Sequence, residues 1–178
     1  MKRSAGRALT MALLGSLVAG QPVIAKAISR GGFVSRAVVF GKSRAIRITF
    51  GNRSELVARG DNPTDTLGTP RIERKGLVAG WSVLGDCSAS YQCPVSVDVV
   101  RLGKLYTIGC EQGMAFGWRF ISTDRIALNC SFPHGTPHAF RQLSTIVTSK
   151  VVGHVDLPDG ADCPPASAPS WSRGKFDE

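Results

Sequence analysis

Three histidines and one aspartate are the residues whose types could carry acid–base or metal chemistry: His134, His138, His154 and Asp156. On a strand, His154 and Asp156 would point to the same side, because side chains two apart share a face, and they could complete a metal site with the other imidazoles. Pro137 opposes this, because it prevents the helical i, i+4 spacing of the familiar zinc motifs. We therefore expect exposed histidines and no metal. The alternative is a small secreted hydrolase or basic nuclease that uses His134, His138 or His154.

Five cysteines form a second set: Cys87, Cys93, Cys110, Cys130 and Cys163. The spacing of Cys87 and Cys93 is wider than that of the usual zinc pairs, and thiolates survive poorly in an oxidising compartment. We expect the disulfides Cys87–Cys93 and Cys110–Cys130, because both close local loops, although four cysteines allow three pairings. The second disulfide would tie together two strands of one sheet. Cys163 is left over, and it can stay free, pair with another chain or replace one of the four.

Basic residues are concentrated in the first third of the chain, where residues 28–75 contain ten Lys or Arg and four Asp or Glu. Two alternating apolar runs, 33–40 and 45–50, are joined by Gly41-Lys42-Ser43 and predict a β-hairpin with a cationic outward face. The residues expected to form this face are Arg36, Lys42, Arg44 and Arg47. One interpretation is an ordinary solvated surface. The other is a site for an anionic polymer or an anionic membrane surface.

The first 27 residues have the pattern of a secretory signal peptide. Lys2, Arg3 and Arg7 precede an apolar run, and Ala25-Lys26-Ala27 has the small-x-small form of a cleavage site. The apolar run is shorter than a membrane-spanning helix requires, and no other segment is a candidate. We expect a secreted or periplasmic protein without a transmembrane segment in its mature chain.

Strand patterns organise the rest of the sequence. From residue 94 to residue 132 we expect four short strands in one antiparallel meander, with Val97 and Val99 on one face, Asp98 on the other and a turn at Gly103-Lys104. Residues 60–76 predict a long exposed loop. Residues 143–157 predict one or two closing strands, with a short helix at 139–143 as the alternative.

The predicted fold class is mainly β: a single antiparallel β-sandwich or open barrel with disulfides and about eight strands. The β-rich domain is expected at residues 28–157, after the signal peptide at 1–27. A disordered tail rich in Pro and Ser is expected at 158–178.

Residues 105–132 carry a family resemblance. Ile108-Gly109-Cys110, Phe116-Gly117, Ser122 and Leu128-Asn129-Cys130-Ser131-Phe132 resemble the two-cysteine pattern of the domain-of-unknown-function 992 family of small exported bacterial proteins. This resemblance implies a periplasmic or secreted β-protein and implies no activity.

Motifs of common enzymes are missing from the sequence. It contains no Gly-x-Ser-x-Gly elbow, no phosphate-binding loop and no dinucleotide fingerprint, so we expect no cofactor. The predicted function is that of an exported, non-enzymatic binding or envelope-associated protein of unknown ligand, which uses its basic face to contact an anionic polymer or lipid.

Overall fold

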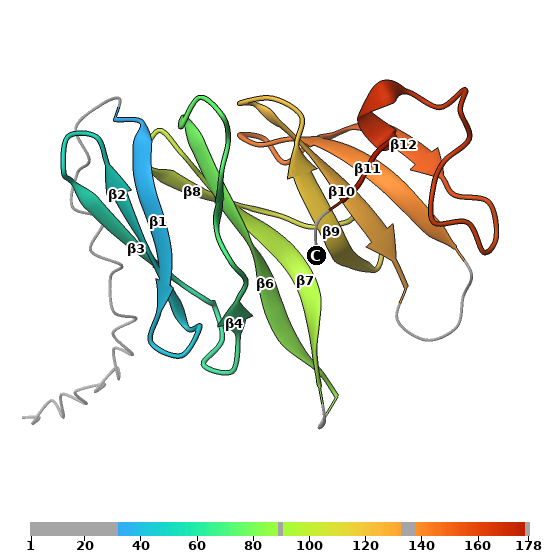
Figure 1. Ribbon diagram of the computed structural model, residues 1–178. Helices are drawn as coiled ribbons and strands as arrows, with labels where there is room; N and C mark the ends of the chain where they lie inside the picture. Colours follow the sequence, from blue (N-terminus) through green and yellow to red (C-terminus); the bar gives the residue numbers. More distant parts are fainter. Residues whose placement is uncertain (1–31, 89–90, 133–137, 177–178) are drawn as a thin grey trace, which may run out of the picture.

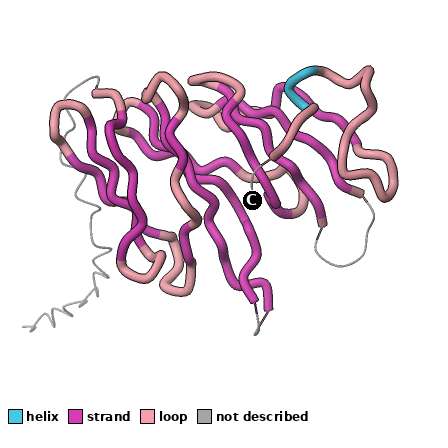
Figure 2. The backbone as a smooth tube through the Cα atoms, viewed as in Figure 1, coloured by secondary structure: helices cyan, strands magenta, loops and turns pink. Residues whose placement is uncertain are grey.

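The computed structural model describes residues 32–88, 91–132 and 138–176, without the side chains of residues 87, 88, 91 and 92 (Figure 1). The predicted signal peptide lies outside these residues. The described chain is almost entirely strand and turn, as Figure 2 shows, with one short 3-10 helix. Its elements are β1 Val34–Phe40, β2 Ala45–Phe50, β3 Glu55–Arg59, β4 Thr66–Leu67, β5 Arg71–Ile72, β6 Val78–Ser88, β7 Tyr91–Arg101, β8 Lys104–Ile108, β9 Met114–Phe120, β10 Arg125–Ser131, β11 Ala139–Thr145, β12 Val151–Asp156 and η1 Ser170–Ser172.

The strands form three open antiparallel sheets, so the predicted mainly β, antiparallel fold class is confirmed. Sheet A has the order β1-β2-β3, and sheet C has the order β12-β11-β10-β9. Sheet B has the order β4-β6-β7-β8, and β5 also pairs with β6. Sheet B lies between the other two (Figure 1). Within the described residues, no helix has the length and apolar character needed to cross a membrane.

Sheet B packs on both of its faces. Ala79 and Trp81 of β6 join the hydrophobic core shared with sheet A, whereas Val78 joins the core shared with sheet C. On β7, Val97 and Val99 contribute to the core with sheet C. A sheet covered on both faces has no solvent-facing side, so its strands need apolar or small residues at successive positions. This explains why β6 has apolar or small residues at successive positions instead of an alternation of apolar and polar residues.

The predicted four-strand meander is divided between two sheets. β7 and β8 form a hairpin in sheet B, and the chain then crosses to sheet C, where β9 pairs with β10. The hairpin turn is Leu102-Gly103, one residue earlier than expected, and both residues have positive φ, as a type I′ turn requires. Lys104 belongs to β8 and pairs with Arg101.

The segment predicted as a long exposed loop, residues 60–76, is partly fixed against sheet B. Its two short strands β4 and β5 both pair with β6. Asp65 and Leu67 are buried. Short strands of this kind cover the hydrogen-bonding edge of a longer strand, which would otherwise be open to other chains.

The end of the β-domain consists of two strands, β11 and β12, separated by residues 146–150. Residues 139–143 belong to β11, so the alternative of a helix there is wrong. Phe140, Gln142 and Ser144 point to the inner face of sheet C, which is the period-two pattern of a strand.

Composition predicts a disordered tail from residue 158, but Asp162 and residues 170–176 lie instead against the outer face of sheet C. Arg141, which is 4% exposed, donates to the carbonyls of Asp162, Ser172 and Gly174. Arg119 donates to the carbonyls of Ser170, Trp171 and Arg173, and both guanidinium groups lie over the ring of Phe176. A proline-rich chain has more carbonyl acceptors than N–H donors, and the two arginines supply donors for them.

A buried carboxyl group lies on the face of sheet B that points to sheet A. Asp98 of β7 is 4% exposed and accepts a hydrogen bond of 2.7 Å from Thr107 Oγ1. Burial raises the pKa of Asp98 to about 6; the Thr107 hydrogen bond opposes this, and the Asp61 and Asp65 carboxylates add to it. The sequence pattern placed Asp98 on the face of the strand opposite Val97 and Val99, and the structure shows that sheet A covers this face.

We predict that Asp98 makes the protein less stable as the pH rises. Between pH 4 and 6 the unfolded chain releases this proton while the folded chain keeps it, so the free energy of unfolding falls by on the order of 2–3 kcal/mol and stays lower above pH 6. Asp98→Asn keeps an acceptor for Thr107 and removes the charge. Urea denaturation should show Asp98→Asn to be more stable than the wild type at pH 8 and equal to it at pH 4. A variant less stable at both values would contradict the raised pKa.

We also predict that Arg141 anchors the tail. Arg141→Met keeps the packing volume and removes three charge-assisted hydrogen bonds, so the free energy of unfolding should fall by roughly 2–3 kcal/mol. Hydrogen exchange should accelerate in residues 162–174. Arg125→Met, an exposed change on the same sheet, is the control. Equal exchange in both variants would show that the tail docks without Arg141.

Candidate functional site

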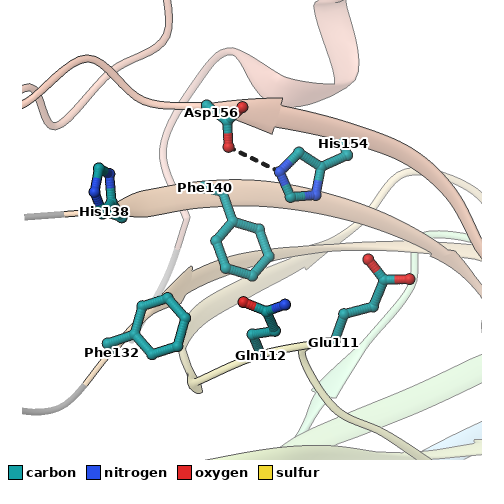
Figure 3. A pocket seen from close by; sticks show the side chains of 7 residues that line it. All are labelled: Glu111, Gln112, Phe132, His138, Phe140, His154 and Asp156. Atoms are coloured by element: carbon teal, nitrogen blue, oxygen red, sulfur yellow. Dashed lines mark hydrogen bonds and ion pairs between the residues drawn. The ribbon is translucent and has the colours of Figure 1, made fainter. Parts of the chain in front are cut away.

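A pocket of about 460 Å³ opens at the edge of sheet C formed by β12 (Figure 3). Its lining combines two phenylalanines with carboxylate, amide and imidazole groups. The residues are Glu111, Gln112, Phe132, His138, Phe140, His154 and Asp156. Two of the three predicted histidines therefore meet at one site, together with Asp156, while His134 lies outside the described residues.

The register of β11 and β12 brings the strand residues of the pocket together. Phe140 pairs with Asp156, and Gln142 pairs with His154. Directly paired residues share a face, and residues two apart on a strand share it too, so all four side chains are on the inner face of sheet C. This part of the site follows from the strand pattern once the register is known.

His154 is held in a defined orientation. Its Nε2 lies 2.9 Å from Asp156 Oδ1, and its ring stacks on that of Phe140 with centroids 4.7 Å apart and planes 14° apart. A carboxylate at one ring nitrogen favours the proton there and leaves the other nitrogen as an acceptor. Figure 3 shows this second nitrogen on the side of the pocket where Glu111 and Gln112 lie. His138 is more exposed, and its Nδ1 is 3.9 Å from Asp159 Oδ1.

The opposite wall is fixed by a disulfide and a buried amide. Cys110 and Cys130 are joined, with Cα atoms 5.9 Å apart, just before Glu111 and Phe132 in the chain. Gln142, which is 1% exposed, accepts from the backbone N–H of Glu111 at 2.8 Å and donates to the carbonyl of Gly109 at 2.9 Å. The backbone that carries Glu111 is therefore held from both sides. The sequence analysis missed Glu111 because it lies between two strands, where no alternation predicts the direction of its side chain. The one feature that could have indicated a role is its position directly after Cys110.

The charges of the pocket restrict its chemistry. The described lining contains the carboxylates Glu111 and Asp156 and no Lys or Arg, so it would repel a phosphodiester. No set of three His, Cys, Asp or Glu residues in the described chain has the arrangement of a metal site. The geometry suits an uncharged or cationic ligand better than the substrate of a nuclease.

The second candidate is the outer face of sheet A. In β1, Arg36, Val38 and Phe40 point away from the core, since Ala37 and Val39 pack into it. Pairing then sets Arg36 beside Thr49, Val38 beside Arg47, and Arg47 beside Val57. Ala45 is beside Arg59, so Arg36, Arg47 and Arg59 form a diagonal across the three strands. We call these three arginines the basic diagonal.

The four predicted binding residues do not all lie together. Arg36 and Arg47 share the outer face, with Arg47 4.0 Å from Glu55 and its guanidinium carbon 5.0 Å from the ring centre of Phe40. Lys42 is exposed in the turn between β1 and β2, where its φ is positive. Arg44 is not part of the outer face of sheet A, because its guanidinium group donates to the carbonyl of Pro63. The third arginine of the face is Arg59, which the alternation of Glu55, Val57 and Arg59 on β3 could have revealed.

The described cysteine side chains agree with the predicted disulfides. Cys110–Cys130 is present, but it joins the crossover after sheet B to sheet C instead of tying strands of one sheet. Cys93 is also disulfide-bonded. The side chain of its expected partner, Cys87, lies outside the described residues. Cys163 is a free, exposed thiol. A disulfide is compatible with an oxidising compartment.

We predict that a thiol assay of the unfolded, unreduced protein detects one reactive thiol, that of Cys163. Adding a disulfide-reducing agent should release the others. Blocking with a maleimide before digestion should label the peptide that contains Cys163, and Cys163→Ser should reduce the count to zero. A labelled Cys110 or Cys130 in the oxidised protein would contradict the bond between them.

No family model matches this chain, and neither the search of curated proteins nor that of solved structures finds a match.

Proposed function

We propose that this protein is an exported binding protein that holds an anionic polymer on the outer face of sheet A. The observation that carries the proposal is the basic diagonal: Arg36, Arg47 and Arg59, one from each strand of an open three-stranded sheet. Export is supported by the signal-like first 27 residues and by the disulfide between Cys110 and Cys130.

The spacing of the three arginines supports a linear ligand. Diagonal neighbours on adjacent strands are about 7–8 Å apart, which is within the Debye length of about 8 Å at physiological salt. Their potentials therefore reinforce one another along a line. Glu55 beside Arg47 is the one acidic side chain that this sheet pattern places among them.

The apolar residues between the arginines favour a polymer over a small ion. Val57 is 43% exposed, and Val38 and Phe40 are partly exposed on the same face. A polymer laid along the diagonal would cover these side chains while its anionic groups meet the guanidinium groups. Guanidinium groups donate to carboxylate, sulfate and phosphate in the same forked geometry, so the proposal extends to the class of polyanions.

The test compares two triple variants with the same change of net charge. Arg36→Ser, Arg47→Ser and Arg59→Ser remove the basic diagonal. Lys104→Ser, Arg125→Ser and Lys150→Ser remove three exposed cations elsewhere, on β8, on β10 and between β11 and β12. On immobilised heparin in a salt gradient, the first variant should elute earlier than the wild type, and the second should elute close to it. The slope of log affinity against log salt should fall by roughly two to three for the first variant.

Equal elution of the two variants would contradict the proposal, because net charge alone would then determine retention. Co-sedimentation with anionic phospholipid vesicles at the same salt concentration provides the comparison with a membrane. Binding to vesicles without retention on heparin would assign the face to a membrane surface instead.

A further inference from the structure

We propose that the pocket on sheet C binds a small organic cation, in which an amine is carried on an apolar ring or chain. This site is separate from the basic diagonal, which lies on sheet A at the other side of sheet B (Figure 1). The two proposals therefore depend on different residues.

The size and floor of the pocket suit a small organic ligand. Its volume of about 460 Å³ falls within the range typical of such sites. Phe140 is buried and Phe132 is partly buried, so both rings are held by packing. Figure 3 shows the Phe140 ring between the two histidines and Gln112. The faces of aromatic rings carry negative potential and attract cations.

The polar rim supplies acceptors for a cation. Asp156 uses Oδ1 for His154, and a carboxylate keeps further acceptor sites after one hydrogen bond. The side chain of Glu111 makes no ion pair within the described part of the chain, although its backbone N–H is fixed by Gln142. Both carboxylates are exposed, so they lie where an ammonium group entering the pocket can reach them, next to the rings of Phe132 and Phe140.

The fixed geometry limits the entropy that binding would cost. The Cys110–Cys130 disulfide, the Gln142 hydrogen bonds and the stacked pair of His154 and Phe140 hold the walls before a ligand arrives. Binding to a preformed site loses less conformational freedom than binding that must order its own walls.

The experiment compares amines with neutral molecules of the same shape. Binding of 2-phenylethylamine, tryptamine and hexylamine to the full mature protein is measured by calorimetry at pH 8, alongside 2-phenylethanol, tryptophol and hexanol. At least one amine should bind about tenfold more tightly than its alcohol. Glu111→Gln and Asp156→Asn should each remove most of that preference, and Asp86→Asn, an exposed carboxylate outside the pocket, should keep it.

NMR chemical shifts of the backbone amides provide a second measurement, which locates the binding site. On addition of the amine, the perturbed residues should include Glu111, Phe140 and His154. Failure of all three amines to bind, equal binding of amines and alcohols, or shifts confined to other surfaces would each overturn the proposal. The triple variant that lacks the basic diagonal should bind amines as the wild type does, so failure of the polyanion proposal would leave this result unchanged.

Discussion

The burial of sheet B on both faces is the constraint on which the rest of the structure depends. Two cores meet at this sheet, one built with sheet A around Trp81 and one built with sheet C around Trp118. Neither outer sheet could bury its apolar face without the central one. The same arrangement places Asp98 out of contact with water, so one of the few charged groups in β7 is carried at a cost in stability.

Sheet C is held to the rest by polar contacts as well as by its core. At the crossover from sheet B, a disulfide and two of the three hydrogen bonds of Gln142 fix the chain between β8 and β9. Trp118 Nε1 also donates to Ser82 Oγ of sheet B at 3.0 Å. On the outer face, Arg119 and Arg141 satisfy the carbonyl groups of the C-terminal segment. Gly153 allows this segment to approach closely, because a Cβ there would lie 2.9 Å from the Trp171 ring.

The three-sheet arrangement separates two surfaces of opposite charge. The outer face of sheet A carries the basic diagonal, whereas the pocket on sheet C is lined by Glu111 and Asp156. Sheet B and its two cores lie between them, so neither group of charges neutralises the other. The two proposed ligands, an anionic polymer and a small cation, would therefore contact different ends of the molecule.

The sequence by itself determined the strands and their faces where one face meets water. The alternation around Gly41-Lys42-Ser43 predicted the β1–β2 hairpin and the shared outward face of Arg36 and Arg47, because period-two alternation is a local property of the chain. The tertiary structure decided which sheet each strand joined, the burial of Asp98, the docking of the tail on Arg141, and the placement of Glu111 and His154 around one pocket. Each of these depends on contacts between segments far apart in sequence, and alternation in one strand carries no information about what covers its second face.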